Sequence, residues 1–100
     1  MLEITNPRLH ELSDDHITLA NTQAATHNPK QVSAGLTLAA GRYAAFFCHH
    51  ASQSKDEMIA KREASIRFFS EEFSRMFARD YDDYVENFDR YRSASNNPPA

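Results

Sequence analysis

Turn-forming residues are scarce in this sequence, which has two glycines and four prolines in 100 residues. A chain of many strands needs frequent hairpin turns, and glycine supplies the backbone conformations that those turns use. Two of the prolines, Pro98 and Pro99, also lie near the end of the chain. The shortage excludes a sheet of many strands and predicts an all-α protein.

The length and composition predict one globular domain. Hydrophobic residues make up 41% of the chain and charged residues 25%, which are typical values for a globular protein. We expect a single helical domain over residues 1–92. Residues 93–100 are small, polar or proline and predict a disordered tail.

Two Asn-Pro pairs mark the starts of the first two helices. Asn6 precedes Pro7 and Asn28 precedes Pro29, which places a capping residue before a proline at the first helical position. The first helix has a thin apolar face with Ile17 at its edge. This face consists of Leu9, Leu12, His16, Leu19, Ala20 and Gln23.

The second segment, residues 30–51, is apolar on nearly all sides. Its bulky face carries Val32, Leu36, Ala39, Ala40, Tyr43, Phe46, Phe47 and His50. Its opposite face carries Ala34, Leu38, Gly41, Ala45 and Cys48. A helix of this kind is buried in the middle of a fold, with the small residues allowing another backbone to come close.

A capping box of Ser54 and Glu57 predicts the start of a third helix, which runs to about Ala78. The apolar pattern shifts phase around Arg79 and Asp80, which predicts a short fourth helix. We therefore expect a compact bundle of three long helices and a shorter C-terminal helix, with the second helix central. All 11 aromatic residues lie in residues 43–91, so the second, third and fourth helices should build the core.

The net charge of −3 disfavours nucleic-acid binding, which needs a basic surface. No stretch approaches the ~20 apolar residues of a membrane span, and no secretory signal pattern is present. The single cysteine, Cys48, excludes an internal disulfide and fits a reducing compartment. We expect a cytoplasmic protein that binds neither membranes nor nucleic acid.

Three blocks of sequence resemble a family of small bacterial proteins of unknown function. They are D-D-H-I-T-L-A-N in the first helix, V-S-A-G-L-T-L-A-A-G-R-Y from Val32 to Tyr43, and D-D-Y-V-E-N-F from Asp82 to Phe88. The resemblance covers about residues 13–88 and implies an all-helical fold without assigned catalytic residues. His16 departs from it, because an aromatic residue is expected there.

The five histidines do not form a metal-binding pattern. Cys48, His49 and His50 are adjacent, and successive helical residues point about 100° apart. Neither H-E-x-x-H nor C-x-x-C occurs, and the aspartates near Asp80 lack the calcium-loop pattern. We predict no metal, no cofactor and no catalytic residues.

Arg42 is the polar residue of most interest, because a guanidinium within an apolar helix must find a carboxylate or reach solvent. It forms either a structural salt bridge or a ligand site, with Tyr43 and His49 as neighbours. The carboxylates available are Asp14 and Asp15 of the first helix and Asp82, Asp83 and Glu86 of the fourth.

The leading hypothesis is a non-enzymatic interaction or assembly module that forms a homodimer or binds another protein. The interface candidates are the thin first helix, through Leu9, Leu12 and His16, and the third helix, through Phe68. A small-ligand-binding protein that uses Arg42 and nearby aromatic residues is the first alternative. An enzyme is the last, because no nucleophile and base occur at usable spacing.

Overall fold

The computed structural model describes residues 5–94 and 97–99. Within these ranges the chain forms five helices and no strand, which confirms the all-α prediction. The helices are α1 (Pro7–Ala24), α2 (Pro29–Ala51), α3 (Lys55–Ala60), α4 (Arg62–Glu86) and α5 (Phe88–Ala94). No helix in the described part of the chain is long and apolar enough to cross a membrane.

The first two helices begin where the Asn-Pro pairs predict. The Asn6 side-chain oxygen accepts a hydrogen bond from the backbone N–H of Arg8 at 2.9 Å. The Asn28 side chain accepts one from Lys30 at 2.8 Å. Each cap satisfies a backbone donor that the first helical turn leaves without a partner, so local sequence fixes both starts.

The predicted boundary at Arg79 and Asp80 is wrong, because α4 continues through both residues to Glu86. These two side chains pair at 3.0 Å on the helix surface, which requires no break. The helix ends instead at Glu86, and the side-chain amide of the next residue, Asn87, donates to the Asp83 carboxylate at 2.9 Å. A second break at Lys61 separates α3 from α4 within the predicted third helix.

Helix α5 ends at Ala94, two residues past the predicted end of the domain. The predicted tail includes residues 95, 96 and 100, which lie outside the described residues, as do residues 1–4. Pro98 is described, and its carbonyl accepts a hydrogen bond from the Asn21 side chain of α1 at 3.0 Å.

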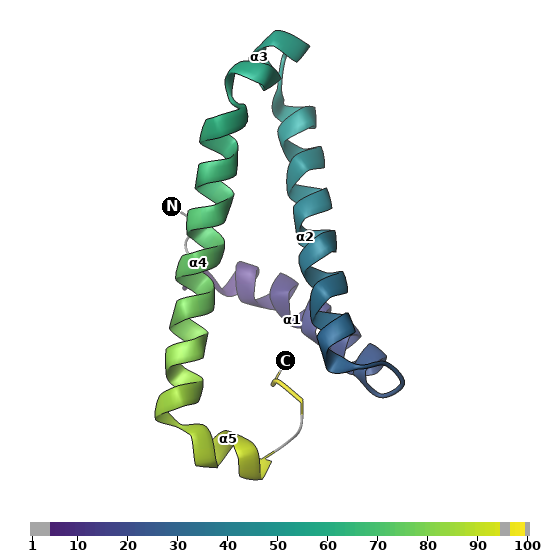
Figure 1. Cartoon of the computed structure of the whole chain (residues 1–100), viewed down its shortest axis with the longest axis vertical. Helices are drawn as coiled ribbons and strands as arrows, with labels where there is room; N and C mark the ends of the chain where they lie inside the picture. Colours follow the sequence, from purple (N-terminus) through teal and green to yellow (C-terminus); the bar gives the residue numbers. More distant parts are fainter. Residues whose placement is uncertain (1–4, 95–96, 100) are drawn as a thin grey trace.

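The helices form an open frame (Figure 1). Helices α2 and α4 are two arms that diverge from α3, and α1 extends from the base of α2 toward α4. The radius of gyration is 16.1 Å, whereas a compact domain of this length has one of about 13 Å. The principal dimensions are 52 × 29 × 23 Å, so a single chain does not form the predicted compact bundle.

No hydrophobic residue in the described ranges is buried. Helix α2 contacts α1, while α4 contacts α3 and α5, and the two arms diverge along their length. The prediction of a central, buried second helix with a core from the aromatic helices is therefore wrong for one chain. Periodicity indicates which faces must be covered, but one chain leaves every hydrophobic residue of the described ranges partly exposed.

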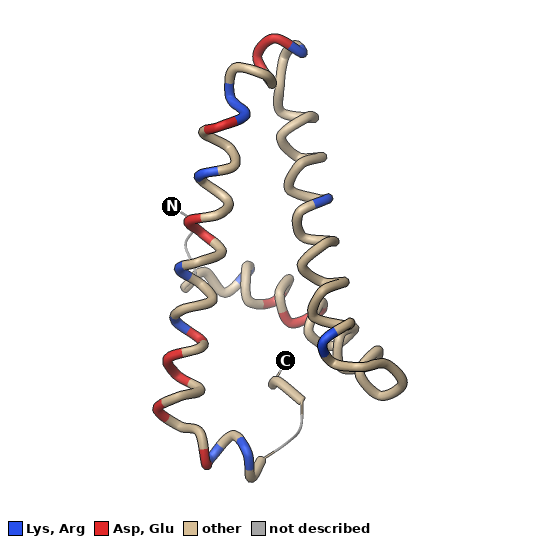
Figure 2. The backbone as a smooth tube through the Cα atoms, viewed as in Figure 1, with Lys and Arg blue, Asp and Glu red and all other residues tan. Residues whose placement is uncertain are grey.

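Helix α2 is exposed although it carries very little charge (Figure 2). Its charged residues are Lys30 and Arg42, with no carboxylate, whereas α4 carries charges of both signs along its length. A helix that is apolar on nearly all sides is stable in water only when other elements cover it. Within one chain, α2 has only partial cover, and none of its residues is buried.

Candidate interaction surface

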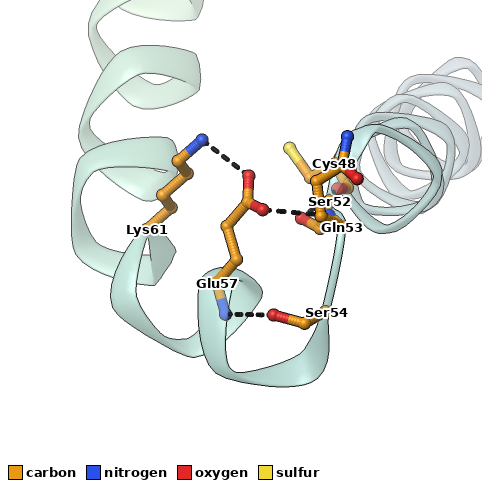
Figure 3. Close-up of polar contacts among 6 residues, drawn as sticks. All are labelled: Cys48, Ser52, Gln53, Ser54, Glu57 and Lys61. Carbon is orange, nitrogen blue, oxygen red and sulfur yellow. Dashed lines mark hydrogen bonds and ion pairs between the residues drawn. The ribbon is translucent and has the colours of Figure 1, made fainter.

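The corner between the two arms is held by polar contacts (Figure 3). The Ser54 hydroxyl accepts a hydrogen bond from the Glu57 backbone N–H at 3.1 Å, which confirms the capping interaction. The Glu57 carboxylate accepts one from the Gln53 backbone at 3.0 Å and one from the Lys61 ammonium at 2.8 Å. Glu57 thus bonds to Gln53 and Ser54, which precede α3, and to Lys61, which follows it.

These contacts lower the pKa of the Glu57 carboxyl below its ordinary value. The hydrogen bond from Lys61 is the largest cause, followed by the bond from the Gln53 backbone. Both bonds favour the charged carboxylate. At neutral pH the corner therefore contains an ionised Glu57.

An apolar groove lies between the arms next to this corner, with a volume of about 610 Å³. We call it the α2–α4 groove. Gly41, Ala45 and Cys48 of α2 line one side of it. Ile59 of α3 and Ile66 and Phe69 of α4 line the other side, with Lys55 and Arg62 also at the groove. The small-residue face of α2 therefore faces large apolar side chains across open space.

The aromatic ladder of α4, formed by Phe73, Phe77 and Tyr81, continues this apolar stripe toward α5. Its ring centroids lie 5.9 and 5.7 Å apart in sequence order. The three side chains are 57, 57 and 58% exposed, although the sequence pattern predicts them in a core. Together with Leu9 of α1 they line a second groove of about 560 Å³.

Helix α1 turns a different side to the rest of the chain than its pattern predicts. Leu9, Ile17 and Ala20 are half-buried, whereas Leu12 and His16 are exposed. Ile17, predicted at the edge of the apolar face, therefore lies near the centre of the half-buried side of α1. The prediction that Leu9, Leu12 and His16 form an interface stays a prediction.

The ligand candidates of α2 are not brought together around one cavity. The centroid of the Tyr43 ring lies 6.1 Å from that of the Phe46 ring. His49 instead lines a hollow near the corner, together with His50 and Lys55. Arg42 is exposed and forms no ion pair with the described carboxylates. Its role as a structural or ligand-binding residue stays a prediction.

Phe68 is less exposed than the aromatic ladder. Its side chain is 38% exposed, and its ring meets the Phe69 ring edge to face at 5.2 Å. The sequence draws attention to Phe68 because charged residues surround it. The sequence does not indicate that the rings of the ladder are exposed, because their regular spacing is the same as that of side chains in a core.

Glu72 is the one buried residue in the described ranges, at 8% exposure. Its carboxylate pairs with the Arg75 guanidinium at 2.5 Å. The sequence pattern places both residues on the charged side of the helix, and only their i, i+3 spacing indicates a pair. No group of three or more potential metal ligands occurs among the residues that the structure describes.

Comparisons with known proteins agree with the fold but name no activity. An NMR structure of the protein NB7890A from Shewanella sp. matches with a TM-score of 0.67 and 32% identity. The match covers 90% of this chain and 92% of that one. A comparison with curated proteins finds no match. Residues 9–85 match the family described as "Protein of unknown function (DUF3144)", which confirms the resemblance to a family of unknown function, and the chain belongs to that family.

Proposed function

We propose that this protein is a non-enzymatic assembly module whose working form is a homodimer. The observation that supports this proposal is the large accessible surface of one chain, 8578 Å². A compact monomer of 11.4 kDa exposes about 5,800 Å². One chain therefore exposes about 2,800 Å² more than a stable monomer of its size would.

The excess has the size of an obligate interface. Such interfaces bury from about 2,000 to more than 5,000 Å² in total over both chains. Two copies that each cover their excess would together bury about 5,600 Å², which lies at the upper end of this range. The compact bundle expected from the sequence would then belong to the dimer, with a core contributed by two chains.

Sedimentation equilibrium and light scattering over a range of concentrations test the proposal. We expect a dimer, with an unfolding midpoint in urea that rises with protein concentration, because unfolding releases two chains. A folded chain that stays monomeric at high micromolar concentration, with a midpoint independent of concentration, would refute the homodimer.

A bacterial, cytoplasmic setting is part of the same proposal. It is supported by the similar protein from Shewanella and by Cys48, a single thiol that fits a reducing compartment. Fractionation of the native cells, followed by detection with an antibody, tests it. Recovery in a secreted or periplasmic fraction would contradict it.

Binding of a small acidic amphiphile is a second candidate function. The α2–α4 groove has a volume in the range of small-molecule sites, and Lys55 and Arg62 beside its apolar walls suit an acidic head group. A thermal-shift screen of organic acids and fatty acids tests it. A ligand at 100 times its dissociation constant adds about 2.7 kcal/mol of stability, whereas no shift across the screen argues against this function.

A further inference from the structure

We propose that the second copy packs onto the inner face of the frame, so that α2 and α4 of two chains form one four-helix bundle. The inner face consists of the α2–α4 groove and the aromatic ladder. This inference rests on the proposed homodimer and specifies its interface. It moves the interface away from the exposed side of α1 and from Phe68.

The apolar side chains of the inner face have the spacing of a helix seam. Ile66, Phe69 and Phe73 of α4 recur at intervals of three and four residues, as do Gly41, Ala45 and Cys48 of α2. Such intervals keep a stripe facing a partner helix along its whole length. A seam of large residues on α4 and one of small residues on α2 are complementary in shape.

The structure leaves space for this contact at Gly41. A Cβ atom added at Gly41 would meet no heavy atom within 4 Å, so nothing in the same chain packs against α2 at this position. A two-fold axis presents the same patch from both copies. The large seam of each α4 can therefore fill the space beside the small seam of the other chain's α2.

Charge supports the pairing of α2 with α4 of the second copy rather than with the other α2. Helix α2 contains Lys30 and Arg42 and no carboxylate. Helix α4 contains seven carboxylates against four arginines, a net charge of −3. Arg42 lies beside the small seam, at the kind of flanking position where charges select partners in helix bundles. A carboxylate on the second copy's α4 is the partner that we assign to it.

Charge substitutions at matched positions of α4 test the inner face. Ile66 and Val85 are β-branched, exposed by 47 and 63%, and Ile66 lines the α2–α4 groove. We expect Ile66→Glu to weaken the dimer by about 100-fold or more, because two unpaired carboxylates would be buried. Val85→Glu, the control, should change the dissociation constant by less than about threefold, as expected for a surface substitution.

Leu12→Glu on α1 tests the competing interface. Dissociation by Leu12→Glu with a dimer retained in Ile66→Glu would overturn the inner face while the homodimer stands. A wild-type chain that is monomeric would instead refute the proposed function itself. One sedimentation experiment on the wild type and the three variants therefore distinguishes an interface on the inner face, an interface on α1 and a monomer.

Thiol reactivity of the unmodified protein gives a second test that needs no substitution. Cys48 lines the α2–α4 groove and is half-buried. Its rate of reaction with Ellman's reagent should fall by about tenfold or more as the chains dimerise, because the open groove is then covered. An unchanged rate while scattering reports a dimer would overturn the inference. Detection by native mass spectrometry of a monomer that carries a bound amphiphile would also overturn the inference.

Discussion

Replacing each glycine of α2 by alanine distinguishes a free face from a packed one. In the isolated chain a Cβ at Gly35 or Gly41 meets no heavy atom within 4 Å. Alanine is favoured over glycine in a helix interior by about 1 kcal/mol, so each substitution would stabilise a free chain by that amount. Gly35 lies on the polar stripe with Arg42 and His49, seven positions apart, which makes it the control.

In the dimer each substitution occurs twice. Gly35→Ala should gain about 2 kcal/mol per dimer and lower the constant for dissociation and unfolding about 30-fold. At Gly41 the added methyl group enters the proposed seam, where overpacking costs about 1–3 kcal/mol per site. The net effect of Gly41→Ala should then lie between no change and a loss of about 4 kcal/mol per dimer.

The assay is urea unfolding followed by far-UV circular dichroism at several protein concentrations, fitted to a dimer that unfolds to two chains. The expected result is a raised midpoint for Gly35→Ala and an unchanged or lowered one for Gly41→Ala. Equal gains for the two variants would refute the reasoning, because they would mean that no backbone or side chain packs against Gly41.

Two pH dependences follow from the polar contacts of the described chain. The pKa of Glu57 is lowered by its bonds to Lys61 and Gln53, so its contribution to stability is complete above pH 4.5 and is lost as the pH falls through the lowered pKa. The urea midpoint of the wild type should therefore fall more steeply below pH 4.5 than that of Glu57→Gln, and parallel curves would contradict this. The pKa of Tyr91 is raised above 10.0, chiefly by its hydrogen bond to the Asp83 carboxylate, and this contribution is lost as the pH rises through the raised value. Ultraviolet titration should show one late tyrosine that is absent in Tyr91→Phe, and its persistence in that variant would contradict the assignment.

The helix starts could be predicted because their causes are local. Asn6, Asn28 and Ser54 each cap a backbone donor two or three residues away. The two ends of α4 could not be predicted, because neither Lys61 nor Asn87 is a residue type that strongly interrupts a helix. At the C-terminal end the Asn87 side chain bonds to Asp83, whereas no side-chain bond caps the start at Lys61.

The location of the core could not be predicted for a related reason. The spacing of Phe73, Phe77 and Tyr81 indicates that these rings need cover, but it is the same whether the cover comes from one chain or two. Whether one chain can cover these rings depends on how α2 and α4 are arranged about α3 (Figure 1). Shape is a tertiary property that a periodic pattern along one helix does not encode.

The corner also has a kinetic consequence. Ser54, Glu57 and Lys61 connect within eight residues, and the Ser52 hydroxyl closes the end of α2 by donating to the Cys48 carbonyl at 2.8 Å. Because these bonds are local, the opening between the arms is set while the chain is still alone. A preorganised hairpin loses less conformational entropy at encounter. Loosening the corner should therefore slow the capture of a second chain more than it speeds escape, so that the six residues of α3 act as a control on the rate of assembly.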